Sequence, residues 1–142
     1  MTVPSACASA PPTPARPLRV VAVQHAAGGD VEGNLAELAR LLPVPEAADL
    51  VVLPEVFACR GSREDRLRAA GPLDGRIGQW LAAEAARRRC WMLGGSIPER
   101  DGARCYNTAL LVNRAGKPIA AYRKIHLFET TLSTGATVRE DE

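Results

Sequence analysis

The sequence of 142 residues contains no apolar run near the roughly 20 residues that a membrane-spanning helix needs, so no membrane segment is predicted. It also lacks a strong charge of either sign, because 18 basic and 16 acidic side chains leave a net charge of +2. A balance this small gives no reason to expect nucleic acid or an anionic membrane as a partner. The one basic cluster, Arg87-Arg88-Arg89, is expected at the end of a helix, where cations interact favourably with the dipole.

Cysteine is scarce and dispersed. The four cysteines, Cys7, Cys59, Cys90 and Cys105, form no Cys-x-x-Cys pair and have no pair of histidines beside them. This spacing argues against a zinc site and against a disulfide framework. We therefore expect no metal or other cofactor, and we expect a reducing cytoplasm as the compartment.

The first 17 residues contain five prolines and lack the apolar segment of a secretory signal. Their single arginine, Arg16, also makes them unlike a transit peptide. The composition predicts a disordered leader over residues 1–17, followed by one domain over residues 18–142.

Apolar periodicity predicts an α/β protein. Short runs rich in β-branched residues predict five strands, at 18–24, 50–53, 91–97, 106–113 and 119–125. The first three strands should be parallel with right-handed crossovers, and the last two should form a hairpin. No strand or helix is predicted after Phe128.

Helical spacing predicts one helix that begins after Asp30 and ends before Pro43, and a second helix over 75–89 that Asp74 caps. A short helix is predicted at 63–70. The apolar face of the first helix is expected to consist of Val31, Leu35, Leu38, Leu41 and Leu42.

Glu55 follows the second strand after Pro54, and ligand sites in such sheets lie beyond the carboxyl ends of strands. A carboxylate behind Val-Val-Leu-Pro is expected to have little water around it. Desolvation would then raise its pKa toward the range of a general base. The alternative is a strand-end carboxylate that faces solvent or caps the following loop.

Lys124 lies in a run with four apolar neighbours, Tyr122, Ile125, Leu127 and Phe128. Burying an ammonium among them costs free energy unless an anion meets it. Such a lysine suits the stabilisation of an oxyanion, where the loss of one donor costs about 2.7–4 kcal/mol. The alternative is a lysine whose charged end reaches water.

Three other residues carry groups that take part in nucleophilic or acid–base chemistry. Cys59 lies in a loop near Arg60 and Arg63, and Cys105 opens the fourth strand, so each is a candidate nucleophile or an incidental thiol. His126 is a candidate base, a candidate ligand or a hydrogen-bonded structural histidine.

Taken together, six segments resemble the nitrilase superfamily of carbon–nitrogen hydrolases over about residues 18–128. The last of them is most similar to the branch of ω-amidases and deaminated glutathione amidases. The resemblance implies an αββα sandwich, of which this sequence matches the N-terminal half. The matching segments, in the order of the family, are 20–24, 34–35, 49–57, 94–99, 106–109 and 122–128.

By this resemblance, Glu55 corresponds to the general base of the family and Lys124 to the lysine that stabilises the tetrahedral intermediate. A further glutamate follows the lysine in the family. Glu140 is its best match, with Asp141 and Glu142 as alternatives.

The nucleophilic cysteine of the family belongs to a block that this sequence does not contain, and neither Cys59 nor Cys105 occupies its place. The resemblance implies hydrolysis of a non-peptide amide or nitrile bond in a small molecule, by a homo-oligomer. We expect a truncated domain that is inactive and prone to aggregation on its own. The alternatives are a non-catalytic remnant that dimerises with a full-length relative, and an unrelated α/β binding domain.

Overall fold

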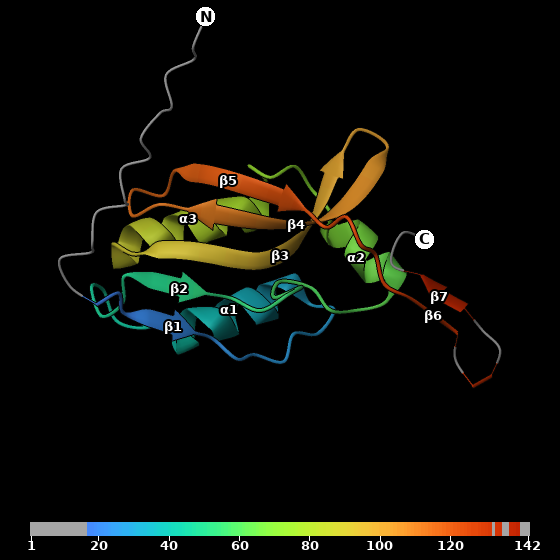
Figure 1. Cartoon of the computed structure of the whole chain (residues 1–142), viewed down its shortest axis with the longest axis horizontal. Helices are drawn as coiled ribbons and strands as arrows, with labels where there is room; N and C mark the ends of the chain where they lie inside the picture. Colours follow the sequence, from blue (N-terminus) through green and yellow to red (C-terminus); the bar gives the residue numbers. More distant parts are fainter. Residues whose placement is uncertain (1–16, 132, 135–136, 140–142) are drawn as a thin grey trace, which may run out of the picture.

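The computed structural model describes residues 17–131, 133–134 and 137–139, and it shows a mixed α/β fold (Figure 1). The main sheet has five strands in the order β1-β2-β3-β4-β5, and β6 pairs with β7. Of the predicted leader over 1–17, all but Pro17 lies outside the described residues. The strands are β1 (Val20–Ala22), β2 (Leu50–Val52), β3 (Trp91–Asp101), β4 (Arg104–Val112), β5 (Pro118–Arg123), β6 (Glu129–Thr131) and β7 (Thr137–Arg139). The helices are α1 (Val31–Leu41), α2 (Arg63–Ala69) and α3 (Arg76–Arg88).

The strand pairing confirms the predicted α/β class. β1, β2 and β3 run parallel to one another, whereas β3 pairs with β4 and β4 with β5 in antiparallel fashion. The hairpin of β4 and β5 therefore follows three parallel strands, as the sequence predicts. The carboxyl ends of β1 and β2 point to the same edge of the sheet.

One predicted helix cap is confirmed and the other is wrong. Asp30 caps α1, because its carboxylate accepts a hydrogen bond from the Glu32 backbone N–H at 3.0 Å. The cap of α3 is Gly75 and not Asp74, and no side chain bonds to the exposed N–H groups there. The Gly75 N–H donates to the Pro72 carbonyl oxygen at 2.8 Å, and the turn so closed places Asp74 one residue before the cap.

Helices α1 and α3 lie on the same side of the sheet (Figure 1). We call this side the covered face. Alternate strand residues point into it and are fully or almost fully buried with the apolar residues of both helices. The strand residues are Val51, Met92, Leu110 and Val112, and the helix residues are Leu35, Leu38, Ile77, Leu81 and Ala85.

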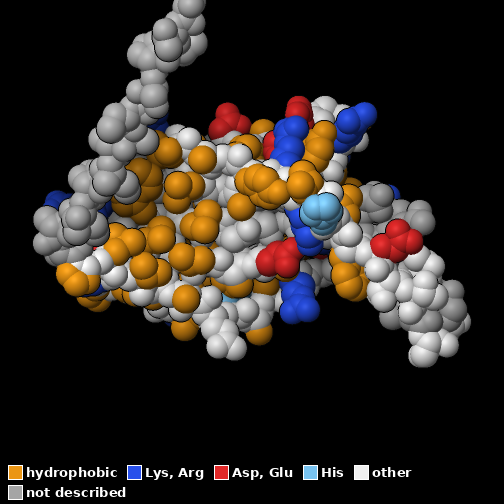
Figure 2. Space-filling view, in the orientation of Figure 1, with side chains coloured by type: hydrophobic (Ala, Val, Ile, Leu, Met, Phe, Trp, Pro, Cys, Tyr) orange, Lys and Arg blue, Asp and Glu red, His pale blue; other side chains and the backbone are white. Residues whose placement is uncertain are grey.

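The residues between these buried ones point to the opposite side, which we call the open face. The register places them side by side across all five strands, and no helix packs on them among the described residues. Figure 2 shows hydrophobic side chains spread over this side of the sheet. These residues are partly buried or exposed, and they include Val20, Leu50, Val52, Trp91, Leu93, Ala109, Leu111, Ala120 and Tyr122.

Three further predictions about the elements differ from the structure. Leu41 was expected on the apolar face of α1 but is 48% exposed, because Leu38 and Leu42, four residues apart, take the buried position. Strand β3 continues to Asp101, beyond the predicted end at 97, because its polar half pairs with β4 through the backbone. Strands β6 and β7 form after Phe128, where no strand was predicted.

The basic cluster at the end of α3 has structural partners. Arg88 is buried and bonds to the Glu84 carboxylate and to the carbonyl oxygens of Ala39 and Pro43. Arg87 also bonds to Glu84, and Arg89 bonds to Glu46. The cluster thus joins α3 to the end of α1 and to the following loop. Among the described residues, none of the helices combines the length and the apolar character needed to cross a lipid bilayer.

Candidate functional site

Glu55 lies just beyond the carboxyl end of β2, in a loop that β3 holds in place. A side chain on Gly95 would overlap the carbonyl oxygens of Leu53 and Pro54, so only glycine lets the loop approach β3 this closely. The next residue, Ser96, accepts a hydrogen bond from the Val56 N–H at 2.8 Å through its hydroxyl oxygen. The Gly94-Gly95-Ser96 segment thus positions the backbone on which Glu55 stands.

Lys124 meets Glu55 across the sheet edge. Its Nζ lies 3.1 Å from Glu55 Oε1, although the two residues are 69 positions apart in the sequence. The Lys124 backbone N–H donates to the Asn107 carbonyl oxygen at 2.8 Å, which continues the pairing of β5 with β4. The structure therefore brings together the two residues that the sequence singled out.

Asn107 is the residue that sequence reasoning missed. Its side-chain Nδ2 donates to Glu55 Oε1 at 3.0 Å, so that one carboxylate oxygen receives both the amide and the ammonium. Asn107 belongs to the segment 106–109, one of the six that resemble the nitrilase superfamily, and this resemblance could have identified it. We name Glu55, Asn107 and Lys124 the polar triad.

The expected desolvation of Glu55 is wrong. Its side chain is 59% exposed, and that of Lys124 is 33% exposed. The neighbours of Lys124 do not enclose it either, because Tyr122, Ile125 and Phe128 are each more than half exposed. Lys124 nevertheless has an anionic partner, which is the Glu55 carboxylate.

Arg123, which precedes Lys124, points to the covered face and holds the end of β5. It donates two hydrogen bonds to the Glu99 carboxylate, at 2.6 and 2.9 Å, and its guanidinium stacks on the Tyr106 ring. Glu99 is buried and also accepts a hydrogen bond from the Thr108 hydroxyl at 2.6 Å. The hydrogen bonds from Arg123 hold the pKa of Glu99 below its usual range. The ion pair between Arg123 and the buried Glu99 carboxylate holds the backbone from which the Lys124 side chain reaches Glu55.

Two of the cysteines, Cys59 and Cys90, are buried. Burial raises the pKa of the Cys59 thiol, and its sulfur lies 3.6 Å from the Gly29 carbonyl oxygen. Burial also raises the pKa of Cys90. Cys105 is exposed, and it lines a cavity of about 400 Å³ that Cys59 and Lys124 also line.

The remaining candidates are His126 and the acidic residues at 140–142. His126 is exposed and forms no hydrogen bond or ion pair within the described part of the chain, so the structural role weighed for it finds no support there. Glu140, Asp141 and Glu142 lie outside the described residues, and the assignment of Glu140 stays a prediction.

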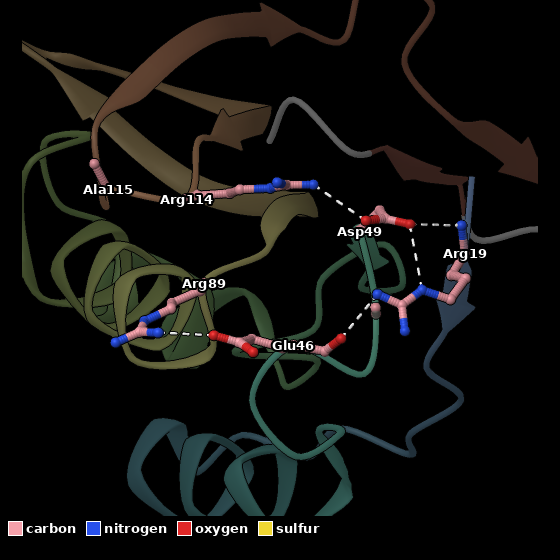
Figure 3. Close-up of a pocket in the computed structure, with 7 residues that line it drawn as sticks. Arg19, Glu46, Asp49, Arg89, Arg114 and Ala115 are labelled. Atoms are coloured by element: carbon pink, nitrogen blue, oxygen red, sulfur yellow. Dashed lines mark hydrogen bonds and ion pairs between the residues drawn. The ribbon is translucent and has the colours of Figure 1, made fainter. Parts of the chain in front are cut away.

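A second charged cluster lies at the other end of β2 (Figure 3). Asp49 is buried there and accepts hydrogen bonds from the Arg19 backbone N–H at 2.9 Å and from the Arg114 guanidinium at 3.1 Å. Beside it, Arg89 pairs with Glu46 at 2.7 Å. These contacts tie the beginnings of β1 and β2 to the turn after β4, and we interpret the cluster as structural.

Comparison with known proteins identifies one family. A family model described as carbon-nitrogen hydrolase matches residues 19–142. A hydrolase of Schizosaccharomyces pombe is 37% identical over 133 residues, which are 89% of this chain and 41% of the yeast protein. A deaminated glutathione amidase of Synechocystis is 32% identical over 130 residues, which are 88% of this chain and 48% of that protein.

A solved structure agrees with these matches. A CN-hydrolase superfamily protein of Xanthomonas campestris has a TM-score of 0.71 and 33% identity, over 78% of this chain and 42% of that one. The chain thus spans less than half the length of the curated relatives it matches, 41% and 48% for the two described above.

Proposed function

Because the chain belongs to the carbon–nitrogen hydrolase family, we propose that its polar triad forms part of a site that hydrolyses a small amide or nitrile. The observation that carries the proposal is the distance of 3.1 Å between Lys124 Nζ and Glu55 Oε1. A base and a cation this close serve the attack of a nucleophile on a carbonyl or nitrile carbon. Relatives named ω-amidase and deaminated glutathione amidase favour an amide as the substrate.

Each member of the triad has a defined task in this proposal. Glu55 accepts the proton of the nucleophilic thiol, and the thiolate attacks the carbonyl carbon. Lys124 stabilises the negative charge that develops on the oxygen. Asn107 orients Glu55 by holding the carboxylate oxygen that also faces Lys124. The amine or ammonia then leaves with the proton that Glu55 took from the thiol, and water hydrolyses the thioester.

The proposed mechanism needs a nucleophilic thiol, and Cys59 does not suit this role. Cys59 is buried, and its raised pKa disfavours the thiolate that the attack requires. We propose that the 142 residues alone do not turn over substrate, and that Glu140 supplements the triad when a nucleophile is present. We also propose a cytoplasmic location, because the sequence has the dispersed cysteines of a reducing compartment.

The test is release of ammonia from a panel of small amides and nitriles, measured for the 142-residue chain and for any longer product of the same gene. We expect no release from the 142-residue chain and release from a longer product that carries a nucleophilic thiol. In that product, Glu55→Gln and Lys124→Met should each lower kcat by about 10²–10³-fold. If the 142-residue chain released ammonia and Glu55→Gln abolished that release, the proposal that these residues alone do not turn over substrate would be wrong.

A second candidate function rests on the open face. Its apolar side chains lie over the sheet without a helix upon them among the described residues, and such patches commonly mark interaction sites. The corresponding proposal is a non-catalytic protein that dimerises with a longer relative. The test is to co-express this chain with such a relative and to measure whether a mixed dimer forms. Hydrolytic activity that depends on this chain's own polar triad would contradict the non-catalytic role.

A further inference from the structure

Val56, the residue that follows Glu55, has a backbone conformation that valine rarely adopts. Its φ is 51°, in the left-handed region, where the Cβ of an L-residue lies too close to the following carbonyl oxygen. For a β-branched residue such a φ is a genuine outlier. The conformation therefore costs free energy that the surrounding contacts have to offset.

Two other residues in the described part of the chain, glycine excepted, have a positive φ, and each has an ordinary reason for it. Arg89, with a φ of 54°, ends α3 as a left-handed C-cap, which is a common way for a helix to end. Glu46, with a φ of 64°, lies in the turn between α1 and β2. Neither is β-branched. Val56 is thus the one β-branched residue with a positive φ among the described residues, and it stands next to a member of the polar triad.

Hydrogen bonds on both sides of the Val56 Cα hold this conformation. The Val56 N–H donates to the hydroxyl oxygen of Ser96, a buried residue, at 2.8 Å. The Val56 carbonyl oxygen accepts a hydrogen bond from the Cys59 N–H at 3.2 Å, which closes a turn. Because both flanking peptide groups are engaged, the φ of Val56 cannot change sign without the loss of one of these bonds.

The segment after Val56 is anchored in the core, whereas Glu55 before it is not. Phe57 and Ala58 are fully buried, and the side-chain Nδ2 of Asn34 on α1 donates to the Ala58 carbonyl oxygen at 2.9 Å. The Glu55 side chain is 59% exposed. If Val56 relaxed to an extended conformation, one of its two sides would have to change direction. Glu55 would move, because an exposed ion pair is far less costly to lose than buried contacts.

We propose that Val56 is a positioning residue, whose left-handed backbone, held by Ser96, directs the Glu55 carboxylate to Lys124 and Asn107. The proposal rests on the proposed function for its effect on hydrolysis, whereas the geometry is a property of the folded chain. Stability is lower at Val56 than an unstrained residue would allow. In return, Glu55 Oε1 lies 3.1 Å from Lys124 Nζ and 3.0 Å from Asn107 Nδ2. Val56 acts through Glu55 and takes no part in bond breaking.

The first test measures the strain by comparing Val56→Gly with Val56→Ala, both of which remove the two methyl groups of valine. At an ordinary φ the alanine variant would be the more stable one, because glycine loses more backbone freedom on folding. In the left-handed region this order reverses. We expect urea denaturation to give a folded-to-unfolded ratio about fivefold higher for Val56→Gly than for Val56→Ala. An equal or higher ratio for Val56→Ala would overturn the proposal.

The second test asks whether the strained residue positions Glu55. The contact is measured as the change that Lys124→Met causes in the ¹³C NMR shift of the Glu55 side-chain carboxyl group. Ser96→Ala removes the acceptor of the Val56 N–H, so the valine should relax and this change should fall by at least half. In the Val56→Gly background, Ser96→Ala should leave the contact in place, because glycine keeps a left-handed φ without strain. A merely structural role of Ser96 predicts no such rescue.

The matched control is Ser62→Ala, which removes another hydroxyl that accepts a backbone N–H, that of Asp65 at the start of α2. It should leave the Glu55 contact unchanged. Retention of the contact in Ser96→Ala with valine present, or equal losses with valine and with glycine, would overturn the positioning role. Circular dichroism verifies that each variant is folded. If Ser96→Ala does not fold, Ser96→Cys takes its place, since a thiol is a weaker acceptor of similar size.

The outcomes separate the positioning role from the hydrolytic function, because the NMR measurement needs no turnover. If it behaves as expected but no product of the gene hydrolyses an amide, the proposed function fails and the positioning role stands. In an active longer product, Ser96→Ala should lower kcat by about 10–10²-fold with little change in KM, and Val56→Gly should restore it. If kcat falls and Val56→Gly does not restore it, the positioning role fails and the proposed function stands.

Discussion

Neighbouring residues of the same strand point to opposite faces of the main sheet, and the residues on the two faces have different roles. On β4, Leu110 is buried against the helices, while Leu111 points to the open face. Thr108 takes part in the buried network of Glu99, whereas Asn107 holds the Glu55 carboxylate. The covered face contains the residues that stabilise the fold, and the open face carries the polar triad at its edge.

The same contrast separates the two ion pairs at the end of β5. Arg123 pairs with a carboxylate that is 5% exposed, and Lys124 pairs with one that is 59% exposed. Removing the partner of a buried carboxylate is costly, whereas an exposed pair contributes little to stability. Arg123 thus stabilises the fold, whereas the adjacent Lys124 is accessible to a ligand.

The largest expected effect compares Leu110→Ala with Leu111→Ala. The first opens a cavity in the core and should lower the free energy of unfolding by about 2–5 kcal/mol. The second removes a side chain that is already partly exposed and should cost about 1 kcal/mol. Urea denaturation of both variants measures the difference, and equal losses would show that another part of the protein covers the open face.

The next effect concerns Glu99→Gln, which should lower the free energy of unfolding by about 1.5–3 kcal/mol at neutral pH. Because Arg123 lowers the pKa of Glu99 in the folded state, this stabilisation is present above the ordinary glutamate pKa of about 4.3. It is lost as the pH falls through the lower, folded-state value. The difference between wild type and variant should therefore shrink below about pH 4. A difference that is constant from neutral to acid pH would contradict the assigned pair.

A charge on the open face should change association more than stability. Leu93→Lys places an ammonium among the apolar side chains at the centre of this face, with Val52 and Leu111 as its neighbours. Self-association, measured by sedimentation velocity, should decrease, while the free energy of unfolding changes by about 1 kcal/mol or less. Unchanged association would show that copies of the chain meet through another surface.

The smallest expected effect on stability is that of Lys124→Met. Loss of an exposed pair should change the free energy of unfolding by about 1 kcal/mol or less, although it should abolish most of any hydrolytic activity. The matched variant Arg123→Met leaves the buried Glu99 carboxylate without its ion-pair partner and should destabilise the protein more. If Lys124→Met were the more destabilising of the two, the contrast between the two pairs would be wrong.

The prediction of elements succeeded where the local signal was strong. Short runs rich in β-branched residues indicated β1 to β5, and Asp30 indicated the start of α1. It failed where pairing depends on backbone contacts between distant segments. The polar half of β3 and the pair of β6 and β7 have no apolar period, and only the partner strand makes them extended.

The sequence predicted two residues of the candidate site that the structure brings into contact, but it did not predict their environment. Glu55 and Lys124 were identified from their positions at strand ends and from the family resemblance. Their exposure was misjudged, because apolar neighbours in the sequence were taken to be neighbours in space. In the structure, Ile125 is 70% exposed and encloses nothing.

By itself the sequence determined the order of the elements up to β5, the family and the two ionisable residues of the candidate site, because each depends on residue types at short spacing. Only the tertiary structure decided that Asn107 joins them and that Arg123 and Lys124 serve opposite faces. The reason is that a strand sends successive side chains to opposite sides, and the pairing register, set by contacts far apart in the chain, decides what each side meets.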